Sequence, residues 1–155
     1  MGVELLDIPA LLRVPFLKKG RDLDGWDCGG CALWLTRTAF GVGLPDFLDG
    51  YDGTDRVHAP AMAATIQAHI DLFEPCAPQA GAWLLFRSFG VACHIGWALD
   101  ATTMVHADDA GVAQGRFSAV AGGGTYCERF DQGKWKSRLL EVRLPRAMIG
   151  GGTAR

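Results

Sequence analysis

The stretch GWDCGGCALW, residues 25–34, sets a cysteine at the start of an expected helix, and the chain is organised around it. Cys28 follows a polar turn over 20–25 and precedes a segment whose apolar residues recur at three- and four-residue spacing. A cysteine at a helix start meets backbone N–H groups and the positive end of the helix dipole, which favour its thiolate. With Cys31 the same stretch also spells Cys-x-x-Cys, a pattern found in redox and metal sites.

Composition and charge indicate one globular domain and exclude some classes of partner. The chain has 155 residues, of which 49% are hydrophobic and 21% charged, so we expect a single domain over 1–155 with a lead-in at 1–13 and a flexible tail at 150–155. The formal net charge is 15 − 17 = −2 without a basic block, which argues against a nucleic-acid partner. No run of about 18 apolar residues is present, so we expect no membrane insertion. The N-terminus lacks the pattern of a signal peptide, so we expect synthesis in the cytoplasm without export.

Expected helices come first along the chain and expected strands follow. The helical segments are short turns within 4–13 interrupted at Pro9, a helix from Cys28 that ends at Gly41, and a second helix over 60–73. The strands are 82–87, 92–99 and 102–107, with weaker ones at 112–118 and 138–144 and a glycine loop at 122–124 between them. Helices followed by strands predict an α+β domain with an antiparallel sheet.

Two histidines lie on neighbouring expected strands. His94 and His106 flank a tight turn that we place at Asp100–Ala101. With that turn the two histidines pair directly across the hairpin, on one face, with Cβ atoms roughly 5 Å apart. One imidazole can then orient the other, which together with Cys28 gives the nucleophile, base and orienter of covalent catalysis.

Four short motifs follow one another in a fixed order over residues 14–107. They are Gly20–Gly30 with the later Gly43-Leu44-Pro45, then Gly81–Phe86, then His94-Ile95-Gly96, and then Val105-His106-Ala107. This series resembles the motifs of NlpC/P60 cysteine peptidases, and the first motif resembles most closely the phage-encoded branch of that family.

The resemblance implies a papain-like α+β fold in which N-terminal helices pack on a central antiparallel sheet. It implies hydrolysis of peptide bonds in the stem peptides of bacterial peptidoglycan, with Cys28 as nucleophile, His94 as general base and His106 as the orienting residue. No metal or organic cofactor is implied. The phage branch further implies a tail component, made in the bacterial cytoplasm, that works beside other tail-tip proteins and opens the host cell wall as DNA enters.

The resemblance also implies substrate contacts close to the nucleophile. Asp27 matches an acidic residue that holds the free amine of the substrate peptide, and Phe16 stands where many members carry a substrate-binding tyrosine. Trp26 either lines the substrate-binding groove or packs against core strands. Gly29 replaces the serine that usually follows the nucleophile, and Ala82 replaces the aspartate of the usual Gly-Asp pair.

Other interpretations of these residues stay open at this stage. Cys31 lies one helical turn after Cys28, so it is either a core residue or a redox thiol, and the two cysteines with the two histidines have the ligand types of a zinc site. We expect His58 and His69 to be solvated or capping residues, and the remaining cysteines at 76, 93 and 127 to be packing residues. Two functional alternatives are a tail-tip structural subunit with a vestigial site, and an amidase or acyltransferase acting on another substrate.

Overall fold

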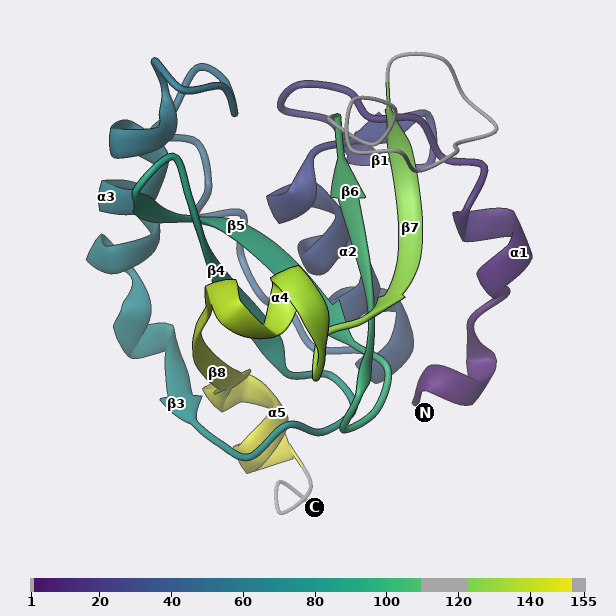
Figure 1. The fold of residues 1–155 in the computed structure, drawn as a ribbon. Coiled ribbons are helices and arrows are strands. Elements are labelled where there is room, and N and C mark those ends of the chain that lie inside the picture. Colours follow the sequence, from purple (N-terminus) through teal and green to yellow (C-terminus); the bar gives the residue numbers. More distant parts are fainter. Residues whose placement is uncertain (1, 110–122, 152–155) are drawn as a thin grey trace.

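The computed structural model describes residues 2–109 and 123–151 of the chain, which form helices packed on an antiparallel sheet (Figure 1). The helices are α1 (Ile8–Leu11), α2 (Cys28–Phe40), α3 (Ala59–Ala68), α4 (Gly133–Arg138) and α5 (Arg146–Gly151), with 3-10 turns at Val3–Leu5 and Ile70–Leu72. The strands are β1 (Arg21–Asp22), β2 (Gly25–Trp26), β3 (Phe73–Pro75), β4 (Trp83–Ser88), β5 (Val91–Ala98), β6 (Thr103–Asp108), β7 (Gly124–Arg129) and β8 (Leu139–Pro145). No described helix has the length and apolar character needed to cross a membrane.

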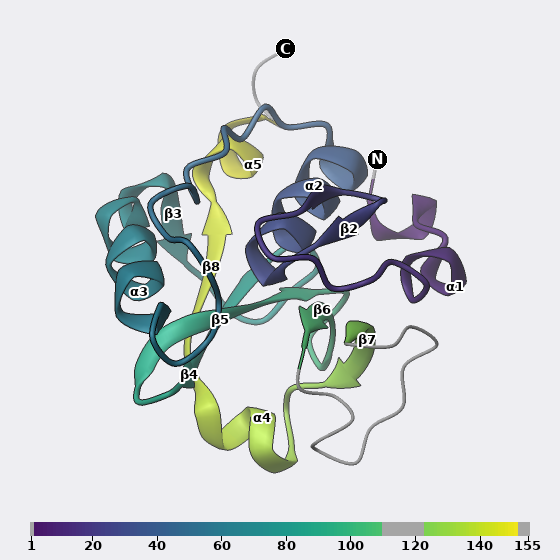
Figure 2. The ribbon, with the colours of Figure 1, turned by 90° about the horizontal axis from the view of Figure 1, so that it is seen from above.

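The main sheet separates two layers of packed side chains. Its six strands run in the order β3-β8-β4-β5-β6-β7, and every pair in it is antiparallel. Helices α2 and α3 cover one face and α4 covers the other (Figure 2). The larger core lies under α2 and α3, where the indole N–H groups of Trp83 and Trp97 both donate to Thr36 Oγ1, at 2.9 and 3.0 Å. These two bonds fix α2 against the centre of the sheet.

Local signals set both ends of α2 as predicted. Asp27 is the N-cap, and its carboxylate accepts the Gly30 N–H at 2.8 Å. Gly41 ends the helix in the left-handed conformation with φ 66°, which glycine adopts without strain. Since Cys28 is the first residue of α2, the expected position of the thiol at a helix start is confirmed.

The predicted strands 82–87, 92–99, 102–107 and 138–144 correspond to β4, β5, β6 and β8. The second helix ends at Ala68 rather than 73, because the last residues of the expected range turn away and Phe73–Pro75 pair with β8. Pro9 lies in the first turn of α1 and starts that helix instead of interrupting it. The predicted strand at 112–118 and residues 152–155 of the expected tail lie outside the described residues, whereas 150 and 151 belong to α5.

The β5–β6 hairpin is shifted by two residues from the predicted pairing. The carboxylate of Asp100 accepts the N–H groups of Thr102 and Thr103, and this moves the turn so that Trp97 pairs with Val105. The two histidines are therefore diagonal neighbours on one face, and the expected direct opposition is wrong. Only two residue pairs join β5 to β6, and the strands diverge beyond them (Figure 1).

Candidate active site

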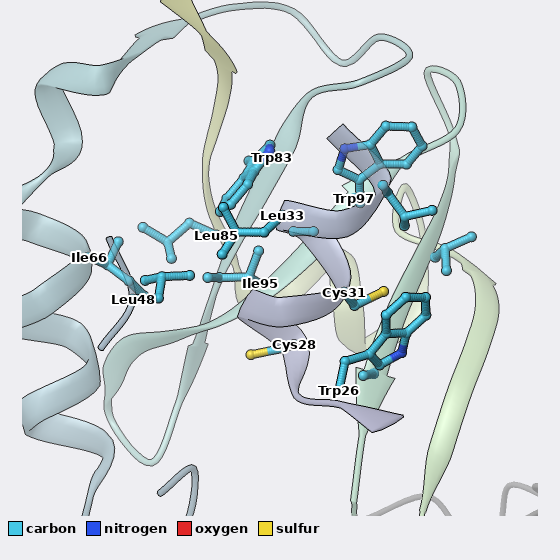
Figure 3. Packing of buried hydrophobic residues seen from close by; sticks show 14 of the residues in the cluster. Trp26, Cys28, Cys31, Leu33, Leu48, Ile66, Trp83, Leu85, Ile95 and Trp97 are labelled. Carbon is cyan, nitrogen blue, oxygen red and sulfur yellow. The ribbon is translucent and has the colours of Figure 1, made fainter. Parts of the chain in front are cut away.

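The thiol of Cys28 lies at the N-terminal end of α2, against β5. The side chain is 3% exposed, and its sulfur and that of Cys31 point to different sides of the helix (Figure 3). Burial, followed by the charge of Asp27, raises the pKa of the Cys28 thiol well above its ordinary value of 9.0, while a hydrogen bond from the backbone of Ile95 acts in the opposite direction. Loss of solvation thus outweighs the helix start.

The two predicted histidines are joined by a hydrogen bond. His94 Nε2 lies 2.9 Å from His106 Nδ1, and the two rings are close to perpendicular at 85°. His106 is fully buried, whereas His94 is half-buried. Trp135 of α4 packs against both rings, with centroids 5.3 Å from His94 in a stacked arrangement and 4.8 Å from His106 edge-on. The diagonal positions thus still allow the predicted contact between base and orienter.

Glu128 extends this pair, and sequence reasoning missed it. Its Oε2 lies 2.6 Å from His106 Nε2. In the β6–β7 ladder His106 pairs with Tyr126, so Glu128, two residues further along β7, lies on the same face of the sheet. The sequence signal for a strand here was weak, because Gly124, the first residue of β7, follows other glycines and was expected to lie in a loop. Strand β7 was therefore not predicted.

A cavity of about 380 Å³ opens where β5 and β6 diverge. Both Cys28 and His94 line it, together with Ala107 of β6 and Trp135 of α4. Phe16 also lines the cavity, at the place where the resemblance implies a substrate contact. The thiol and the first histidine of the pair therefore lie on the wall of the same space.

Among the described residues, the wall of this cavity carries more cationic than anionic side chains. Arg56, Arg87 and Arg138 line it, against the carboxylates of Asp108 and Asp109. A guanidinium group binds carboxylates with two parallel hydrogen bonds. The lining therefore suits a ligand that carries negative charge.

Comparison with known proteins identifies the fold. No family model matches the sequence, and no curated protein matches it. A solved structure from Staphylococcus aureus, described as similar to a lipoprotein of the NLP/P60 family, matches 92% of this chain with a TM-score of 0.56 and 19% sequence identity. The chain has an NlpC/P60-like fold. It corresponds to 41% of the length of that neighbour, and the predicted α+β class with helices on an antiparallel sheet is confirmed.

Within this NlpC/P60-like fold, Asp27 is part of the scaffold that supports Cys28 at the start of α2. Its carboxylate has no exposed surface and accepts hydrogen bonds from Arg21 Nη1 at 3.0 Å, Tyr51 Oη at 2.5 Å and the Lys19 N–H at 3.1 Å, in addition to the Gly30 N–H. The guanidinium of Arg21 thus lies beside the carboxylate that was expected to hold a substrate amine. The structure thus gives Asp27 a structural role, and its expected contact with a substrate amine stays a prediction.

Trp26 is also placed away from the cavity. It is fully buried, and its indole N–H donates to Thr125 Oγ1 at 2.8 Å, which ties the start of α2 to β7. Of the two interpretations of Trp26, the structure supports packing. Phe16 is thus the one member of the three expected substrate contacts that lies at the cavity wall.

The remaining cysteines and histidines have separate environments. Cys31 is 1% exposed within the core, where burial raises the pKa of its thiol, and all five cysteines are free. Among residues 2–109 and 123–151, no group of three or more histidine, cysteine and acidic side chains is arranged to hold a metal ion. Cys93 lines the cavity, which the packing interpretation did not foresee. His58 contacts Asp55, and His69 contacts the carbonyl oxygen of Thr65.

Proposed function

We propose that this protein is a cysteine peptidase that hydrolyses peptide bonds in peptidoglycan stem peptides. The observation that carries the proposal is a buried thiol at a helix start that shares a cavity with a histidine, itself hydrogen-bonded to a second histidine, within an NlpC/P60-like fold. Such an arrangement supplies a nucleophile, a base and an orienting group. The fold alone would be compatible with many functions, so the site carries the argument.

The reaction begins with proton transfer from the thiol of Cys28, whose pKa is raised by burial. His94 accepts the thiol proton as the sulfur attacks the scissile carbonyl, and a tetrahedral oxyanion forms. The backbone N–H of Cys28 lies in the first turn of α2, where helical N–H groups have no partner within the helix, so it can donate to this oxyanion. His94 then protonates the leaving amine, and water hydrolyses the thioester.

The cavity wall supports an acidic peptide as substrate. Peptidoglycan stem peptides carry free carboxylates, which three arginines of the lining can bind. Phe16 offers an apolar surface in the same cavity, but it cannot donate the hydrogen bond of a tyrosine. We therefore assign recognition of the substrate chiefly to its negative charge.

Digestion of purified sacculi, with mass spectrometry of the released fragments, tests the proposal. Cys28→Ala should abolish release, and His106→Ala should retain a small part of the activity because an orienting group is less essential than the base. Cys127→Ser is the matched control, since Cys127 is exposed on β7 and does not line the cavity. Unchanged release by folded Cys28→Ala would refute the assignment of the nucleophile.

We further propose, from the resemblance of the first motif to the phage-encoded branch, that the protein acts as a component of a phage tail. Its partners would then be other tail-tip proteins, and its place of action the host cell wall. Mass spectrometry of purified virions should detect the chain in the tail fraction. Detection only in host lysate, with virions free of the chain, would contradict this setting.

A further inference from the structure

We propose that Glu128 is a positioning residue that fixes the tautomers of His106 and His94 and thereby directs the basic nitrogen of His94 to the thiol. The observation is a continuous chain of contacts, from Glu128 Oε2 to His106 Nε2 at 2.6 Å and from His106 Nδ1 to His94 Nε2 at 2.9 Å. The inference rests on the proposed function in one respect, which is that His94 serves as the base for Cys28.

The direction of each hydrogen bond follows from the chemistry of its end groups. The side chain of Glu128 is 23% exposed, and an ionised carboxylate can only accept hydrogen bonds. His106 must therefore carry a proton on Nε2, and in the neutral ring its Nδ1 is then an acceptor. His94 must donate from Nε2 to that acceptor, so the lone pair of neutral His94 is on Nδ1.

Burial makes this selection strict. His106 has no exposed surface, and Trp135 packs edge-on against its ring. In the folded protein the partner of His106 Nε2 is therefore the Glu128 carboxylate rather than bulk water. The β6–β7 register holds Glu128 on that face, two residues beyond the partner of His106. The carboxylate is thus built into the same sheet as the histidine that it orients.

The tautomer matters because the nucleophile must lose its proton during the reaction. If His106 carried its proton on Nδ1, His94 Nε2 would have to accept, and the proton of neutral His94 would sit on Nδ1. His94 could then no longer take a proton from Cys28 at that nitrogen. Since Glu128 does not line the cavity, its loss should lower kcat and leave KM nearly unchanged. We expect kcat of Glu128→Leu to fall roughly 10- to 100-fold, a part of what general base catalysis contributes.

Nitrogen-15 spectra of histidine-labelled protein test the tautomers directly, without a substrate. The wild-type chain should show protonated Nε2 and unprotonated Nδ1 in both His94 and His106. Glu128→Asp retains an acceptor-only carboxylate and should preserve this pattern. Glu128→Gln should lose it, because an amide can donate as well as accept and so does not select one tautomer.

The rate of Cys28 alkylation by iodoacetamide, followed by peptide mass mapping, gives a second readout that needs no peptidoglycan. The alkylation rate should fall in Glu128→Leu and Glu128→Gln by the same factor as kcat, and it should recover in Glu128→Asp. Glu141→Gln is the control, because Glu141 pairs with Arg143 on β8, and its rate should stay unchanged. If Glu128→Leu does not fold, Glu128→Gln decides. Wild-type tautomers and alkylation rates in Glu128→Gln would overturn the inference, whereas inactivity on sacculi with the expected spectra would refute only the proposed substrate.

Discussion

Removal of the Asp27 carboxylate should destabilise the fold rather than merely weaken substrate binding. In Asp27→Ala the helix α2 loses its N-cap, which is worth about 1 kcal/mol. The buried Tyr51 hydroxyl and the Arg21 guanidinium lose a charged acceptor, and breaking a buried pair costs roughly 3–5 kcal/mol. Arg21 is 21% exposed and keeps Asp46 at 2.9 Å as a partner, so the loss of the pair should fall below that range, at about 2 kcal/mol. With the cap, the total should be about 3 kcal/mol.

Urea unfolding of wild type and Asp27→Ala measures this loss. For a chain of this size, about 3 kcal/mol also corresponds to a fall in Tm of roughly 6–12 °C. Tyr51→Phe removes one of the four donors and should cost only about 1 kcal/mol, which makes it a graded control. A folded Asp27→Ala within 1 kcal/mol of wild type, with KM raised for a peptide that has a free amine, would refute the structural role and restore the substrate contact.

Three further predictions follow from the same region and the cavity. Gly30→Ala should destabilise the protein by about 1–3 kcal/mol in urea unfolding, because an added Cβ would lie 2.0 Å from the backbone oxygen of Gly20; an unchanged midpoint would contradict this. Burial, followed by the charge of Asp27, raises the pKa of Tyr51 above its ordinary value of 10.0, so stability should be complete below about pH 10 and fall as pH rises further. Tyr51→Phe should flatten that alkaline slope, and equal slopes would count against it. Arg87→Ala should raise KM for an acidic peptide about 5-fold with little change in kcat, and an unchanged KM would argue against charge recognition at this wall.

The first half of the site could be predicted from sequence because its determinants are local. A polar turn, an aspartate N-cap and apolar residues at helical spacing lie within a few residues of Cys28, and they specify α2 without help from distant segments. The strands that carry His94 and His106 were also visible from their apolar, β-branched and aromatic residues. Their exact pairing was not visible, because a side-chain cap by Asp100 moved the turn.

The second half of the site depends on contacts between distant residues. Glu128 lies 22 positions after His106 and reaches it only because β7 pairs with β6. Trp135 comes from α4, a short helix with no amphipathic repeat to reveal it. The partners of Asp27 are similarly remote, since Tyr51 follows it by 24 positions. None of these contacts follows from spacing along the chain.

The position of Cys28 links these two halves through a physical requirement of the proposed mechanism. A partly solvated thiol at a helix start can ionise with little assistance. Cys28 is instead nearly inaccessible and next to a carboxylate that opposes its ionisation. In the proposed mechanism, its ionisation is therefore coupled to proton uptake by His94, in the tautomer that leaves the lone pair on Nδ1. The Glu128 carboxylate meets this requirement, because it fixes which nitrogens of the neutral His106 and His94 rings donate and which accept before the substrate arrives. In that mechanism, the burial of Cys28 is the reason that β7, the strand least visible in the sequence, contributes to the chemistry.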